Sequence, residues 1–128
     1  MCHGIKIDDG KFKAFVRYMV KVAEEKRCVP YYELENVFGL NHKYVGGYAG
    51  TLGDFCEDQE WPLLNALIIS TTECVPSEGF DQYMEGTDMD WGEHVQDCWK
   101  TFHVTSTRAK QVKNFSRLDS RVTDFFAA

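Results

Sequence analysis

Apolar side chains recur at steps of three and four residues along most of the chain, which is the spacing of one buried face of an α-helix. This spacing predicts helices over about residues 8–27, 31–38, 42–58 and 88–103, followed by a helical C-terminal segment. The apolar run Leu63–Ile69 directly follows Pro62, and proline stops a helix, so a short buried strand is predicted there. The pattern indicates an α+β, helix-rich single domain over residues 1–128, with a short sheet that includes residues 63–70.

The helix predicted over residues 42–58 organises the rest of the chain. Its apolar positions form one stripe: Val45, Tyr48, Ala49, Leu52, Phe55 and Cys56. It also contains four glycines, each of which costs about 1 kcal/mol relative to alanine inside a helix, so we expect close packing against the predicted strand. Short polar side chains that can cap a helix precede this helix and two others: Asn41, Asp8 or Asp9, and Thr87 or Asp88.

Charge is segregated along the sequence. The net charge is −6, yet residues 44–99 contain twelve acidic residues and no lysine or arginine, whereas both ends of the chain are net basic. Two interpretations follow. In the first, the basic ends fold over the acidic middle; in the second, an acidic face repels nucleic-acid phosphates and attracts a basic partner.

The five cysteines are odd in number, widely spaced and without a C-x-x-C pair, which favours reduced thiols over a disulfide framework. The longest apolar run is far shorter than the roughly 20 residues that a membrane helix needs, and the N-terminus lacks an apolar signal segment. We therefore expect a cytoplasmic protein without a membrane partner. The oligomeric state does not follow from the sequence.

The segment Val29–Gly39, VPYYELENVFG, resembles the V-P-Y-G-x-(V/L)-A-x-x-I-G segment of the winged-helix family of DNA alkyltransferases and alkyltransferase-like proteins. Lys43–Gly46 stands where that family has R-A-V-G in its recognition helix, and Ser77–Phe80 is similar to its glycine-aromatic wing. The resemblance covers residues 29–80. It implies a winged-helix-like core.

The family's P-C-H-R acceptor motif is absent, because Trp61-Pro62 is followed by Leu63-Leu64 and no Cys-His pair. Alkyl transfer needs a thiolate with a neighbouring histidine, so the resemblance does not imply this activity. Four carboxylates also follow the recognition-helix position, where they would lie close to DNA phosphates: Asp54, Glu57, Asp58 and Glu60.

Three functional hypotheses remain. The first is a non-enzymatic binding or inhibitor protein whose acidic face, within residues 54–97, engages a basic protein that handles nucleic acid. Small acidic inhibitors of phage and mobile-element origin, including DNA mimics and anti-CRISPR or anti-restriction proteins, are similar in size and charge. The residues of this face are Asp54, Glu57, Asp58, Glu60, Glu78, Asp81, Glu85, Asp88 and Asp90.

The second hypothesis is a winged-helix protein that binds nucleic acid directly, through Lys43, Tyr44, Arg108, Lys110 and Lys113. The third is a small enzyme with a site around His94, flanked on its helix by Asp90 and Asp97. We interpret these three residues as an ordinary exposed polar face and Cys98 as a core thiol. No enzyme motif, calcium loop or other cofactor or metal pattern is present, so we predict no enzymatic activity, cofactor or metal.

Overall fold

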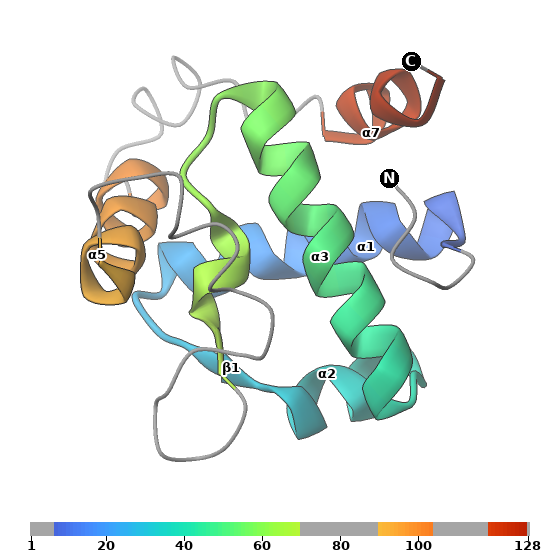
Figure 1. Ribbon diagram of the computed structural model, residues 1–128, viewed down its shortest axis with the longest axis horizontal. Coiled ribbons are helices and arrows are strands. Elements are labelled where there is room, and N and C mark those ends of the chain that lie inside the picture. The colour runs from blue at the N-terminus through green and yellow to red at the C-terminus, as the bar shows by residue number, and fades with distance from the viewer. Residues whose placement is uncertain (1–6, 70–89, 104–117, 128) are drawn as a thin grey trace.

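The computed structural model describes residues 7–69, 90–103 and 118–127 of the chain. Its elements are α1 (Asp9–Glu24), β1 (Val29–Pro30), α2 (Tyr31–Phe38), α3 (His42–Gln59), the 3-10 helix η1 (Leu64–Leu67), β2 (Ile68–Ile69), α5 (Trp91–Phe102) and α7 (Leu118–Ala127). In Figure 1, α3 crosses in front of α1, with α5 beside one half of α1 and α7 toward the other. The predicted helix-rich fold with one short sheet is confirmed.

Helix α1 begins where the sequence predicted and ends earlier. Asp8 caps it by accepting a hydrogen bond from the Gly10 amide at 3.2 Å. Its buried face consists of Phe12, Phe15, Val16, Met19, Val20, Val22 and Ala23. The helix stops at Glu24 rather than at residue 27, because Lys26 adopts a left-handed φ of 54° and the Arg27 amide folds back to the Val22 carbonyl.

The sheet differs from the prediction in extent. Residues Leu64–Leu67 form a 3-10 turn, which the Ala66 amide closes on the Leu63 carbonyl, and only Ile68–Ile69 is strand. The whole run is buried, and hydrophobic periodicity cannot separate a short buried strand from a short buried helix. β2 pairs in parallel with β1, with Val29 opposite Ile68. The winged-helix-like core remains a prediction, and its expected wing at residues 77–80 lies outside the described residues.

The boundaries between α2 and α3 follow local chemistry. Gly39 ends α2 in a left-handed conformation, φ 64°, with the Leu40 amide bonded to the Glu35 carbonyl. Asn41 then caps α3, its side-chain oxygen accepting from the Tyr44 amide at 2.9 Å. Both boundaries agree with the sequence prediction.

Removal of the α3 cap gives a first testable outcome. We expect Asn41→Ala to lower the free energy of unfolding by about 1 kcal/mol, because the Tyr44 amide loses its acceptor. Asn36→Ala is the matched control, since Asn36 is exposed within α2 and caps nothing. Urea unfolding of both variants measures the difference, and equal losses would contradict the capping role.

Helix α3 is buried on more than one side, which explains its mixture of apolar and small residues. Its buried positions are Val45, Gly47, Tyr48, Ala49, Thr51, Leu52, Gly53, Phe55 and Cys56. The ring of Phe55 contacts Phe12, Trp61 and Phe125 at centroid distances of 6.0, 5.6 and 5.3 Å. Phe126 packs on Phe12 at 5.4 Å. The C-terminal phenylalanines therefore dock on the core.

Helix α5 begins at Trp91, with Asp90 rather than Thr87 or Asp88 as its cap, and ends at Phe102. The indole nitrogens of Trp91 and Trp99 donate to the carbonyls of Ala66 and Arg27 at 2.8 and 3.2 Å. These bonds join α5 to η1 and to the chain after α1.

Candidate functional site

Charged residues on α3 oppose its dipole at both ends. The N-terminal end of a helix favours negative charge and the C-terminal end positive charge. Here exposed Lys43 lies in the first turn, whereas Glu57 and Asp58 are exposed in the last turns, which contain no basic residue. The two charged ends are separated by about 22 Å, at 1.5 Å per residue. The charge pattern of α3 therefore lowers, rather than raises, the stability of the helix.

The last residue of this acidic end is also conformationally unfavourable. Glu60 takes a left-handed φ of 59°, a position that glycine occupies at lower cost. The Trp61 amide bonds to the Cys56 carbonyl at 2.9 Å, and the Trp61 ring packs on Phe55. Glu57, Asp58 and Glu60 are all exposed at this end of the helix. We call these three residues the acidic end.

Basic side chains do not neutralise the acidic end within the described residues. The ion pairs of the described residues lie elsewhere. Lys21 pairs with Glu24, Arg27 pairs with Glu25 and Glu33, and His42 lies beside Glu35. Asp54, one turn earlier, is half-buried and has an interaction of its own.

Arg121 of α7 is the basic residue placed beside this end of α3. It donates to the Gln59 side-chain oxygen at 2.7 Å, and its guanidinium lies 5.6 Å from the centroid of the Trp61 ring. Within the described residues, Arg121 is thus the base of the C-terminal segment that contacts the end of α3. That contact supports the folding-over interpretation only in part.

Asp90 and Glu93, at the start of α5, have a structural role. The Asp90 carboxylate accepts from the Glu93 amide at 2.9 Å, and the Glu93 side chain returns to the Asp90 amide at 3.4 Å, which makes a capping box. Both residues remain exposed. The other predicted members of the face, Glu78, Asp81, Glu85 and Asp88, lie outside the described residues.

His94 corrects one interpretation. Its side chain is only 4% exposed and has a partner of its own, so it is not part of an exposed polar face. The four-residue spacing put His94 on the same helix face as Asp90, yet in the structure His94 is buried, as is Val95 next to it. Among the described residues, no group of three His, Cys, Asp or Glu side chains is arranged to hold a metal ion.

The residues of the nucleic-acid hypothesis are only partly described. Lys43 and Tyr44 are exposed beside His42 at the start of α3. Arg108, Lys110 and Lys113 lie outside the described residues. Beyond its first turn, α3 presents mainly buried side chains and carboxylates.

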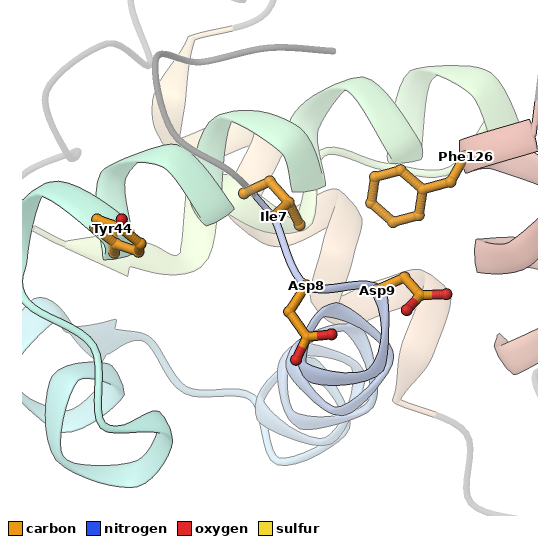
Figure 2. Close-up of a pocket in the computed structure, with 5 residues that line it drawn as sticks. All are labelled: Ile7, Asp8, Asp9, Tyr44 and Phe126. Carbon is orange, nitrogen blue, oxygen red and sulfur yellow. The ribbon is translucent and has the colours of Figure 1, made fainter.

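A recess of about 680 Å³ is lined by residues at the starts of α1 and α3 and near the end of α7. Figure 2 shows Tyr44 at one side and Phe126 at the other, with Ile7, Asp8 and Asp9 between them. Apolar and aromatic walls with nearby carboxylates suit a cationic side chain that has an apolar stem. Sequence reasoning missed this recess, because its residues come from three distant segments.

Cys56 and Cys98 are fully buried thiols, which confirms Cys98 as a core residue. Burial raises the pKa of Cys56 to about 12 and raises the pKa of Cys98 as well. The Cys98 thiol donates to the Leu63 carbonyl at 3.2 Å.

Because these two thiols are buried, we expect the free energy of unfolding to fall at alkaline pH. The folded protein keeps them protonated, whereas the unfolded chain releases their protons near pH 8.5, so stability falls as pH rises from about 9 toward 12. We expect the slope of unfolding free energy against pH over this range to be shallower in Cys56→Ala/Cys98→Ala. Urea unfolding between pH 7 and 10.5 measures it, and an unchanged slope would contradict the assignment.

No helix in the described part of the chain is both long and apolar enough to cross a membrane. Comparisons of the chain with protein-family models, with curated proteins and with solved structures found no match.

Proposed function

We propose that this protein is a non-enzymatic binding or inhibitor protein whose acidic surface engages a basic protein that handles nucleic acid in the cytoplasm. The observation that carries the proposal is the acidic end of α3. Three carboxylates stand exposed there at the unfavourable pole of the helix, and within the described residues none of them forms an ion pair, although Arg121 lies beside Gln59. Charge that costs stability is commonly retained where function requires it.

A basic partner would remove this cost on binding. Lysine or arginine side chains would pair with Glu57, Asp58 and Glu60 and oppose the negative pole of α3. The likeness in size and charge to acidic inhibitors of phage and mobile elements, DNA mimics among them, agrees with such a role.

The recess between α1, α3 and α7 supports the same partner chemistry. A lysine or arginine stem would lie against Ile7 and Phe126, while its charged head would meet the Asp8 or Asp9 carboxylate. Tyr44 offers a ring face for a guanidinium.

Direct nucleic-acid binding by a winged-helix-like core is the second candidate. It is favoured by exposed Lys43 and Tyr44 at the start of α3 and by the basic side chains of α1. The acidic end of the same helix opposes it, because phosphates there would be repelled.

A mobility-shift titration with duplex and single-stranded DNA and RNA, at low and moderate salt, separates the two candidates. We expect no shift at low salt. Binding that weakens steeply with salt and disappears in Lys13→Gln/Lys43→Gln would overturn the proposal in favour of the second candidate.

A further inference from the structure

A second concave surface lies between α1 and α2, away from the acidic end of α3. This groove measures about 530 Å³ and is lined by Gly10, Lys13, Ala14, Arg17, Tyr18, Val37 and Phe38. None of the acidic residues assigned above contributes to it.

The floor of the groove is apolar and accessible. Val37 is 50% exposed, which is unusual for a large aliphatic residue in the described part of the chain. Phe38 lies half-buried beside it. On the α1 side, Gly10 and Ala14 are exposed, small and four residues apart, so they form a low wall that another helix could approach closely.

The rim of the groove is basic. Lys13 and Arg17 line it at four-residue spacing on α1, Arg17 with an interaction of its own, and no carboxylate is among the described residues that line it. Glu33 of α2 is already held by Arg27 and by the Tyr18 hydroxyl. A basic rim around an apolar floor contrasts with the net charge of −6 of the chain.

We infer that the α1–α2 groove, with its apolar floor at Val37 and Phe38 and its basic rim at Lys13 and Arg17, docks an acidic amphipathic helix of a partner protein. The apolar face of that helix covers Val37 and Phe38, and its carboxylates face Lys13 and Arg17. Charge complementarity selects this occupant.

The rings in the groove argue against a nucleic-acid occupant. Tyr18 and Phe38 pack edge to face on each other at 5.5 Å, and Phe38 also packs on Phe15. Base stacking requires open ring faces and a longer track of positive charge. The inference does not depend on the proposed function, because the two surfaces differ in charge and share no residue.

The test is fluorescence anisotropy with a labelled 18-residue synthetic helix that has leucines on one face and glutamates on the other. We expect saturable binding by the wild-type protein that weakens as salt is raised. Val37→Asp should lower the affinity at least tenfold, and Lys13→Glu should lower it severalfold. Tyr32→Asp is the matched control, because Tyr32 is 57% exposed on α2 but lies outside the groove.

Circular dichroism melting establishes that each variant folds, and Ala14→Arg blocks the groove sterically if Val37→Asp does not fold. The inference is overturned if the wild-type protein does not bind the helix, or if Val37→Asp and Tyr32→Asp act alike. It is also overturned if a lysine-substituted helix or a 20-nucleotide oligo(dT) binds better, or if Val37→Asp dissociates a dimer of this chain seen by sedimentation.

Discussion

Phe55→Ala is expected to lower the free energy of unfolding by about 3–5 kcal/mol, which is the usual cost of truncating a buried phenylalanine. The Phe55 side chain is fully buried, at 0% exposure. Its ring touches α1 through Phe12, α7 through Phe125 and the chain after α3 through Trp61. A cavity there cannot collapse easily, because the surrounding rings are held by three separate segments.

Urea unfolding measures this loss, with Phe55→Leu and Tyr32→Ala as controls. Phe55→Leu leaves a smaller cavity, so it should cost less than Phe55→Ala. Tyr32→Ala removes an exposed ring, so it should change stability by no more than about 0.5 kcal/mol. A loss below about 1 kcal/mol in Phe55→Ala would contradict the assignment of this residue to the centre of the core.

The second large effect concerns the acidic end of α3. We expect Glu57→Gln/Asp58→Asn/Glu60→Gln to reduce affinity for the basic partner at least tenfold, or by about 1.4 kcal/mol. The folded variant should be no less stable than the wild-type protein. Each exposed charge removed from the unfavourable helix pole returns about 0.3–1 kcal/mol at low salt. Opposite effects on stability and affinity distinguish a binding surface from a structural one.

The difference in affinity between wild type and this variant should shrink as salt is raised, because exposed charge pairs are screened. Titration of the partner at several salt concentrations, combined with urea unfolding of the protein alone, measures both quantities. A variant that binds as well as wild type, or that is strongly destabilised, would contradict the account.

Local chemistry made the end of α2 and the start of α3 predictable. Asn41 and Gly39 mark caps whose side chain or backbone freedom is needed at that position. The end of α1 was not predictable, because the chain leaves the helix through the left-handed φ of Lys26, which no residue type in that segment indicates. The predicted strand was mostly wrong, because a buried apolar run carries no periodicity and tertiary contacts selected a 3-10 turn over Leu64–Leu67.

The candidate site was predictable in charge but not in shape. The sequence predicted the acidic character of Glu57, Asp58 and Glu60, and exposure of these residues agrees with it. It did not predict that Asp90 serves as a cap or that His94 is buried, because both depend on how α5 sits on its neighbours. The α1–α2 groove and the recess at Tyr44 arise only when distant segments meet.

Affinity capture from a host-cell lysate tests whether the acidic end of α3 binds a basic partner. The baits are the wild-type protein, the acidic-end variant Glu57→Gln/Asp58→Asn/Glu60→Gln, and the charge-matched control Glu24→Gln/Glu25→Gln/Asp124→Asn. We expect the wild type and the control to retain a basic, nucleic-acid-handling protein that the acidic-end variant loses. Equal capture by all three baits, or loss with the control alone, would contradict it.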